Sequence, residues 1–222
     1  PPKRRQSLYL SPEDQDKPRA FAAELKRAAK LGPAALLECK LAESASRKRT
    51  AVVERAMDTL REGGKVIVFT GRHKEADSMA DPLHRAVKRE KLDALVLSGH
   101  GGDTSPEARN DMRERYMDHR GAVVLVGTMQ AWGTGYNLHD TDLLIFAQLP
   151  WTGGELHQYE QRVSRRGQTR PVLIVYVICE ETVDEHVAAT LINKLPAMED
   201  VAGDVETASA AEAIGGREDK EK

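Results

Sequence analysis

The chain lacks the features of a membrane-bound or secreted protein. Its longest apolar runs fall well short of the roughly 20 residues that span a bilayer, and no signal peptide is visible. It has only two cysteines, Cys39 and Cys179, far apart in the sequence, so neither zinc-ligand spacing nor a disulfide framework is indicated. We therefore expect no membrane partner and a cytoplasmic location.

Net charge is also nearly absent. The formal charge is -2 at pH 7 and the pI is about 6.5, which excludes a globally basic nucleic-acid-binding protein. Any contact with nucleic acid must come from local patches. The chain starts at Pro1 and not at Met, so we expect a fragment of a longer protein.

The sequence does contain a regular alternation of apolar runs and amphipathic stretches. With 222 residues and 40% hydrophobic content, it is long enough for one good core. The pattern predicts an α/β fold of three layers, in which helices flank a mostly parallel central sheet. The expected strands are residues 66–69, 94–97, 122–126, 143–146 and 172–178, and the expected helices are 74–90, 106–117, 155–165 and 183–194.

The two ends of the chain are less regular. We expect a strand at residues 7–10, a helix that starts at Ser11, a loop or broken helix over 31–45, and a helix over 46–61. After Pro196 the composition turns to Ala, Glu, Asp, Gly and Ser, with little apolar surface to offset chain entropy. Residues 196–222 are therefore expected to form an acidic, disordered tail.

Two segments carry most of the functional information. Residues 127–138, GTMQAWGTGYNL, enter a glycine-rich loop whose bare backbone can approach a ligand closely. Residues 161–168, QRVSRRGQ, set Arg162 and Arg165 three residues apart on one helical face, where both guanidinium groups could reach a polyphosphate. The ordinary alternatives are a tight turn for the glycines and a solvated basic face for the arginines.

A phosphate-cradling loop is absent from the sequence. The pattern Gly-x-x-x-x-Gly-Lys-Ser/Thr does not occur, and Gly63-Gly64-Lys65 precedes a predicted strand where such a loop would follow one. Residues 183–186, VDEH, look at first like a metal-binding acidic box, but helix capping through Thr182 and Glu185 accounts for them, so no metal site is expected. Any main grip on a polyphosphate ligand must therefore lie in another part of the protein.

Residues 7–194 together resemble the second RecA-like lobe of the Swi/Snf-like DNA translocases, within the superfamily-two helicases. The similarity includes a strand that ends in Phe and a small polar residue, KVIVFT at 65–70, and a strand with a small-residue turn, LSGH at 97–100, before the helix that carries Arg109. The fifth helicase motif is similar to residues 128–138 and the sixth to residues 161–168. The ordered pair of motifs makes this resemblance specific.

The resemblance implies the C-terminal lobe of an ATP-dependent DNA helicase or translocase. Residues 1–45 would lead in from a first RecA-like lobe, which holds ATP with Mg, and residues 46–195 would form the second lobe. Duplex DNA, contacted without sequence preference, is the implied nucleic-acid partner. The implied arginine fingers are Arg162 and Arg165; the residues on the ATP side are Gly133, Gly135, Asn137 and Gln168; those on the nucleic-acid side are Thr70, Gly71, Ser98, Thr128 and Met129.

Some positions depart from the family pattern. Residues 147–151 read AQLPW where the family usually has an aspartate, Ser164 replaces a common histidine, and Arg166 replaces a hydrophobic residue. These changes suggest a divergent bacterial or viral branch, where association with the nucleoid is a further location. One alternative is a non-catalytic RecA-like module that binds nucleic acid or protein, although such a module has no need to retain both arginines. Another is an unrelated doubly wound enzyme such as a methyltransferase, for which Thr70-Gly71-Arg72 is a poor glycine-rich turn.

Overall fold

The computed structural model describes residues 3–16, 21–100, 104–133, 135–164, 170–194 and 205–215. The elements in chain order are β1 (Lys3–Leu10), α1 (Ala22–Leu31), α2 (Pro33–Arg47), α3 (Arg49–Arg61), β2 (Lys65–Thr70), α4 (His73–Glu90), β3 (Ala94–Gly99), α5 (Pro106–Asp118), β4 (Ala122–Thr128), α6 (Met129–Trp132), β5 (Leu143–Phe146), α7 (Gly153–Val163), β6 (Val172–Cys179), α8 (Val183–Lys194) and α10 (Val205–Gly215).

The strands form one six-stranded sheet in the order β1-β6-β5-β2-β4-β3, and every pairing in it is parallel. The inner strands β2, β4 and β5 are buried along their whole length, as expected for apolar runs covered on both faces. Because all strands run the same way, the loops that follow them gather at one edge of the sheet, called here the carboxyl edge.

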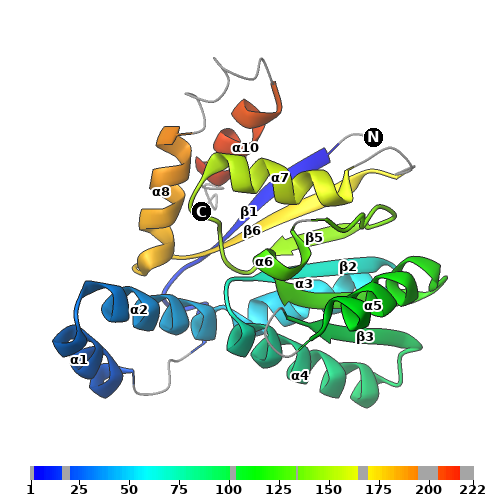
Figure 1. The fold of residues 1–222 in the computed structure, drawn as a ribbon, viewed down its shortest axis with the longest axis horizontal. Coiled ribbons are helices and arrows are strands. Elements are labelled where there is room, and N and C mark those ends of the chain that lie inside the picture. The colour runs from blue at the N-terminus through cyan, green and yellow to red at the C-terminus, as the bar shows by residue number, and fades with distance from the viewer. Residues whose placement is uncertain are drawn as a thin grey trace.

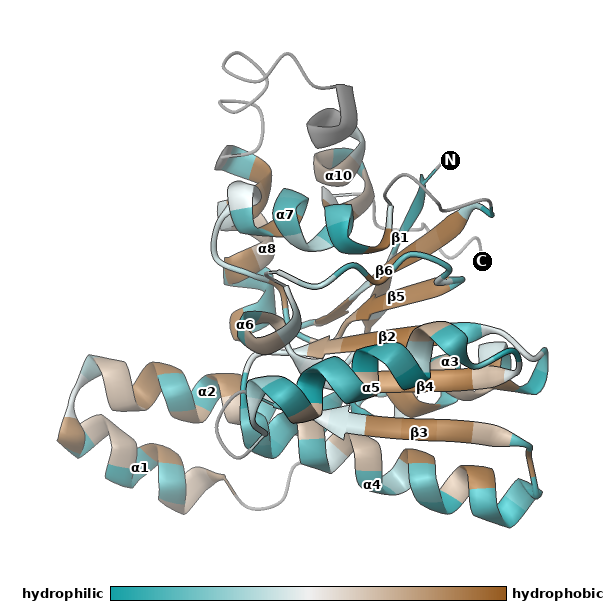
Figure 2. Cartoon of the chain, turned by 45° about the vertical axis from the view of Figure 1, so that its right-hand side comes forward, coloured by the Kyte–Doolittle hydropathy of each residue, from teal (hydrophilic) through white to brown (hydrophobic). Residues whose placement is uncertain are grey.

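Helices cover both faces of the sheet, which confirms the predicted three layers (Figure 1). Alternate side chains of each strand point to opposite faces. One face packs against α3 and α4, and the other against α5, α6, α7, α8 and α10. Figure 2 shows the apolar strands between helices whose outer surfaces are hydrophilic. Across the described ranges, no helix is both long enough and apolar enough to cross a membrane.

Helices α1 and α2 form a hairpin that projects from the body of the protein (Figures 1 and 2). The predicted loop over 31–45 is wrong, because Pro33 occupies the first turn of α2, where its missing N–H costs nothing. Gly32, with φ of 115°, ends α1 and separates it from α2. The predicted helix start at Ser11 is also wrong: Ser11 Oγ donates to Asp14 Oδ2 at 2.7 Å within a turn.

A buried ion pair anchors the base of this hairpin. Lys48, between α2 and α3, lies 2.5 Å from Asp184 in the first turn of α8, and both side chains are buried. Asp184 Oδ2 also accepts a hydrogen bond from the backbone N–H of Cys179 at 3.1 Å. The sequence suggested that helix capping accounts for Asp184. The structure shows a further role, because Asp184 joins the base of the hairpin to α8.

Both ends of the described chain belong to the packed lobe. Strand β1 pairs with β6 along eight residues, so it is part of the sheet and more than a link from a preceding domain. Residues 205–215 form helix α10 where disorder was expected. Ala210 and Ile214, four residues apart, are buried on one face of α10, and the Ser7 and Tyr9 side chains of β1 donate to its last carbonyls. The low apolar content of residues 196–222 led to the prediction of disorder, although this segment contains a short amphipathic helix.

Candidate functional site

The carboxyl edge of the sheet brings together the five residues predicted for the nucleic-acid side. Thr70 ends β2 and Gly71 follows it, Ser98 lies near the end of β3, and Thr128 ends β4. Met129 then opens the short helix α6. Segments from residue 70 to residue 129 thus meet at the edge where open α/β sheets bind their ligands.

Glycine is favoured at two positions of the loop after α6, for a different structural reason at each. A Cβ at Gly133 would lie 2.1 Å from ring carbons of Tyr159 on α7, so only glycine fits this contact. Gly135 has φ of 81°, a left-handed conformation that favours glycine, and no atom crowds its Cβ position. Gly133 therefore sets the packing of the loop on α7, and Gly135 sets its turn.

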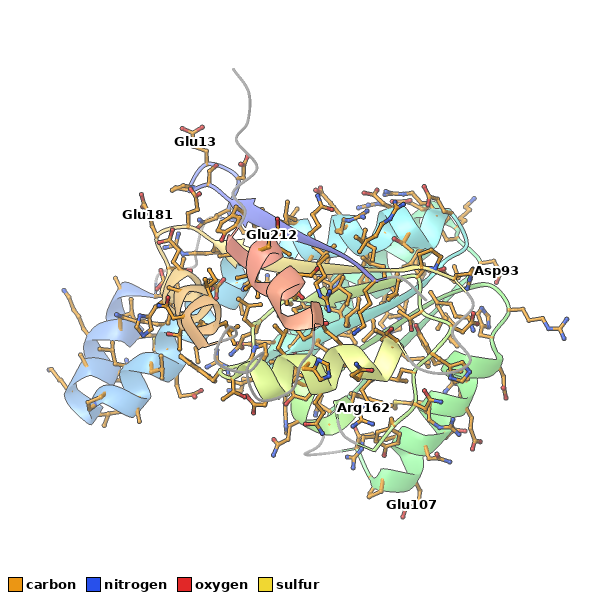
Figure 3. All side chains as sticks on the ribbon, turned by 90° about the horizontal axis from the view of Figure 1, so that it is seen from above. Glu13, Asp93, Glu107, Arg162, Glu181 and Glu212 are labelled. Carbon is orange, nitrogen blue, oxygen red and sulfur yellow. The ribbon has the colours of Figure 1, made fainter. Side chains whose placement is uncertain are left out.

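Arg162 lies in the last turn of α7 and holds this glycine loop (Figure 3). Its Nε donates to the carbonyl of Gly133 at 2.9 Å, and its own carbonyl accepts from Leu138 N–H at 3.0 Å. The side chain is 9% exposed. The two sequence motifs are thus joined directly through one residue. Arg165 and Gln168 lie outside the described residues.

Asn137 lies between these two attachment points. Its Oδ1 is buried and, among the described residues, has no hydrogen-bond donor. A buried acceptor without a partner is unusual in a folded protein, because it loses its bond to water and gains nothing in return. The loop therefore offers an open acceptor beside the Arg162 attachment.

The two threonine hydroxyl groups predicted to contact nucleic acid make their hydrogen bonds inside the lobe. Thr70 Oγ1 lies 3.2 Å from the carbonyl of Arg72 and 3.4 Å from that of Gly127, and Thr128 Oγ1 accepts from Ala131 N–H at 3.3 Å to cap α6. Both threonines are no more than 2% exposed. The N–H of Gly71 donates to Glu75 Oε2 at 3.2 Å. In this conformation these groups stabilise the strand ends, and the exposed chemistry at this edge comes from their neighbours.

The neighbour that the sequence prediction missed is Arg72. It caps α4, and its backbone N–H and its Nε both donate to the carboxylate of Glu75, at 3.2 and 2.8 Å. On the other side of the guanidinium, Nη1 lies 2.8 Å from Glu38 Oε2 of helix α2. Burial raises the pKa of Glu75, an effect that the charge of Arg72 opposes. The spacing of Arg72 and Glu75 could have indicated the capping pair, but nothing in the sequence points to Glu38.

A second missed residue, Glu160, fixes α7 to the sheet. Its carboxylate is 1% exposed and accepts from Arg5 of β1, with Nη2 at 2.6 Å, and from the hydroxyl of Tyr176 in β6. Burial, followed by the charge of Glu160, raises the pKa of Tyr176 well above its usual range, so the phenol stays a donor. Glu160 lies two residues before Arg162 in the same helix, so this network holds the turn from which Arg162 projects.

Arg170 and Lys65 lie at the opposite edge of the sheet. Arg170 pairs with Asp140 at 3.0 Å and with Asp142 at 3.2 Å, just before β5 begins. Lys65 Nζ donates to the carbonyls of Tyr116 and Met117 and pairs with Asp140. The segment Gly63-Gly64-Lys65 is therefore a structural turn at the start of β2 and cannot cradle a phosphate.

An all-parallel sheet of this order, covered by helices on both faces and with the glycine loop after β4 bonded to Arg162 of α7, is the fold of a RecA-like helicase lobe. The family model described as "Helicase conserved C-terminal domain" matches residues 48–170, more than half of the chain. The chain belongs to this family and is a C-terminal lobe of the Swi/Snf-like type.

The curated relatives are much longer proteins. A Drosophila melanogaster protein, "SWI/SNF-related matrix-associated actin-dependent regulator of chromatin subfamily A-like protein 1", is 28% identical over 86% of this chain and 25% of its own length. An "Uncharacterized ATP-dependent helicase" of Mycoplasma pneumoniae is 24% identical over 67% of this chain and 14% of its own length. The chain thus spans about a quarter or less of the relatives it matches.

Solved structures show the same fold. The C-terminal part of the Fun30 ATPase domain superposes with a TM-score of 0.53 at 18% identity, over 76% of this chain and 53% of that one. T4 UvsW superposes with a TM-score of 0.51 at 12% identity, over 79% of this chain and 32% of that one.

Proposed function

We propose that this chain is the second lobe of an ATP-dependent DNA motor of the helicase or translocase type. A first RecA-like lobe holds ATP with Mg, and Arg162 and Arg165 of this lobe approach the nucleotide when the two lobes close. The carboxyl edge contacts the backbone of DNA without sequence preference. The relatives named as ATP-dependent helicases support the use of ATP.

The observation that carries this proposal is the direct attachment of Arg162 to the glycine loop. The bond from Nε to Gly133 O fixes the inner side of the Arg162 guanidinium group, and the packing of Gly133 on Tyr159 fixes the loop. A side chain held in this way is pre-organised to stabilise charge on a transferring phosphate, which is most of the catalytic work in phosphoryl transfer. Residues of a solvated basic helix face have no such attachment.

The remaining site residues take roles that fit their positions. Gly133, Gly135 and Asn137 form the face toward the nucleotide, where the unpaired Oδ1 of Asn137 can accept a hydrogen bond from ATP. Gln168 belongs to the same group by its place in the sixth motif. Ser98, Met129 and the backbone around Thr70, Gly71 and Thr128 line the nucleic-acid side, with phosphate contact supplied mainly by exposed basic neighbours.

The test is to replace Arg162 in the complete two-lobe protein. Arg162→Ala should lower DNA-stimulated ATP turnover by on the order of 10³ with little change in nucleotide affinity, because the charge acts chiefly in the transition state. Arg162→Lys should stay impaired, since lysine has no planar fork and cannot reproduce the Nε bond. Arg165→Ala and Arg165→Lys should have the same effects on turnover and nucleotide affinity.

Arg170→Ala is the matched control. Arg170 is eight residues from Arg162 in the sequence, but it pairs with Asp140 and Asp142 at the edge of the sheet opposite the carboxyl edge. Its loss should therefore leave turnover largely intact. Turnover, nucleotide affinity and thermal midpoint are measured for each variant. Near-normal turnover in folded Arg162→Ala and Arg165→Ala proteins would eliminate the arginine-finger assignment.

A further inference from the structure

A large groove separates the α1–α2 hairpin from the start of α4. Its volume is about 1010 Å³, and it opens onto Gly71 and Gln130, the neighbours of the proposed nucleic-acid side. The proximal part of α2 is buried at Leu41 and Ala45, whereas Leu31 at the hairpin tip is 76% exposed. The hairpin is therefore anchored at its base and free of packing at its tip, and one wall of the groove belongs to it.

The two walls of this groove carry opposite charges. The charged residues that the hairpin contributes are Glu24 and Glu38, both acidic. The opposite wall contributes Arg49, Arg72 and Lys74. That wall also holds Asp16 and Glu75, but Asp16 is bonded to the N–H of Thr50 and the buried Glu75 caps α4. The acidic wall thus faces cations that could otherwise bind an anionic ligand.

One pair joins the two walls directly. Glu38 Oε2 lies 2.8 Å from Arg72 Nη1, which also donates to the backbone carbonyl of Glu38. The Glu38 side chain is 62% exposed and that of Arg72 is 27% exposed, so solvent or a ligand can reach the pair. Arg49 adds a buried Nε that has no hydrogen-bond partner among the described residues. The groove therefore has one cation covered by the hairpin and another without a bonded anion.

We propose that Glu38 competes with a nucleic-acid phosphate for Arg72, so that the α1–α2 hairpin acts as an acidic gate on the nucleic-acid side of the lobe. This inference rests on the nucleic-acid contact of the proposed function. When a phosphodiester backbone enters the groove, it replaces the Glu38 carboxylate on the Nη1 side of the guanidinium, while Glu75 keeps the Nε side and the cap of α4 in place. Because DNA must displace Glu38, its binding to this groove is weaker than it would be to the basic wall alone.

The experiment measures the affinity of this 222-residue chain for a short DNA duplex at low salt, by fluorescence anisotropy. Glu38→Gln should bind about two- to fivefold more tightly, the scale expected from removing a part-exposed competing ion pair. Glu90→Gln is the matched control: it also removes one carboxylate from an ion pair, with Arg61 at 2.8 Å, but at the C-terminal end of α4. Its affinity should stay close to that of the unchanged chain.

Arg72→Gln and the double variant Glu38→Gln/Arg72→Gln complete the cycle. Arg72→Gln should weaken binding, and Glu38→Gln should add nothing in its background. Equal gains in Glu38→Gln and Glu90→Gln, or a gain that persists without Arg72, would show a general charge effect and overturn the gate. A loss in Arg72→Gln with no gain in Glu38→Gln would overturn the gate and leave the proposed nucleic-acid contact intact; absence of binding in all variants would overturn that contact and the gate together. Thermal midpoints show whether each variant is folded.

Discussion

Glu160 joins three elements, α7, β1 and β6, through one buried carboxylate. Its carboxylate receives Arg5 from β1 and Tyr176 from β6, and Lys3 Nζ lies 3.8 Å away. A carboxylate that is 1% exposed is tolerated only because these partners surround it. At this scale the protein uses a buried charge to set the orientation of the helix that carries Arg162.

Replacing Glu160 by Gln should therefore destabilise the lobe. The change removes the buried carboxylate that pairs with Arg5 and Lys3, a loss of about 3 kcal/mol for a broken buried pair, or roughly 6–12 °C in the thermal midpoint of a domain of this size. Differential scanning calorimetry of the isolated chain measures it. Glu43→Gln, which breaks the partly exposed pair with Arg47, is the control and should change the midpoint much less. Equal midpoints for the Glu160 and Glu43 variants would show that the buried network contributes nothing special.

At the scale of elements, α10 is the least expected part of the structure. It packs on β1 and α8, and its attachment includes Ser7 Oγ to Ala213 O and Tyr9 OH to Ile214 O, each at 2.5 Å. Arg5 Nη1 also donates to Ser209 Oγ at 3.2 Å, so the same arginine touches both α10 and the Glu160 network. The helix thus covers the edge strand of the sheet and completes the core on that side.

Deletion of residues 205–222 should lower stability. The lost burial of Ile214 and Ala210 and the lost hydrogen bonds, less the entropy of ordering the helix, amount to roughly 2 kcal/mol, or about 4–8 °C in midpoint. Deletion of residues 216–222 alone keeps every α10 contact named above and should leave the midpoint unchanged. If the longer deletion also has no effect, α10 does not pack on the lobe in solution. Ile214→Ala should reproduce part of the loss without shortening the chain.

At the scale of the whole molecule, the proposed function gives this lobe one half of a catalytic site. Arg162 at the end of α7 is bonded to the glycine loop that follows β4, and the one Gly-Gly-Lys sequence lies at the start of β2 with its lysine bonded to backbone carbonyls. No segment in the sequence has the phosphate-cradling pattern. An isolated lobe of this kind can position charge but has little to hold the nucleotide.

The purified chain should therefore hydrolyse ATP only at background rate, with or without DNA. Addition of a first lobe, in one polypeptide, should restore DNA-stimulated turnover. A coupled phosphate-release assay on the two proteins checks both statements, and the two-lobe Arg162→Ala variant serves as the inactive reference. Robust DNA-stimulated hydrolysis by the chain alone would refute the two-lobe scheme.

Local sequence determined the alternation of buried strands and amphipathic helices, the caps at Ser105 and Thr152, and the two motifs, because periodicity and capping depend on residues a few positions apart. Tertiary structure alone decided which of those residues can contact a ligand and which are bonded inside the lobe. Thr70 and Thr128 turn inward, Arg162 meets Gly133 across 29 residues, and Glu38 meets Arg72 across 34. It also decided that a short alanine-rich segment becomes α10, since only the surface of β1 and α8 makes burial of Ile214 favourable. These outcomes depend on what lies opposite each side chain after folding, and no local pattern carries that information.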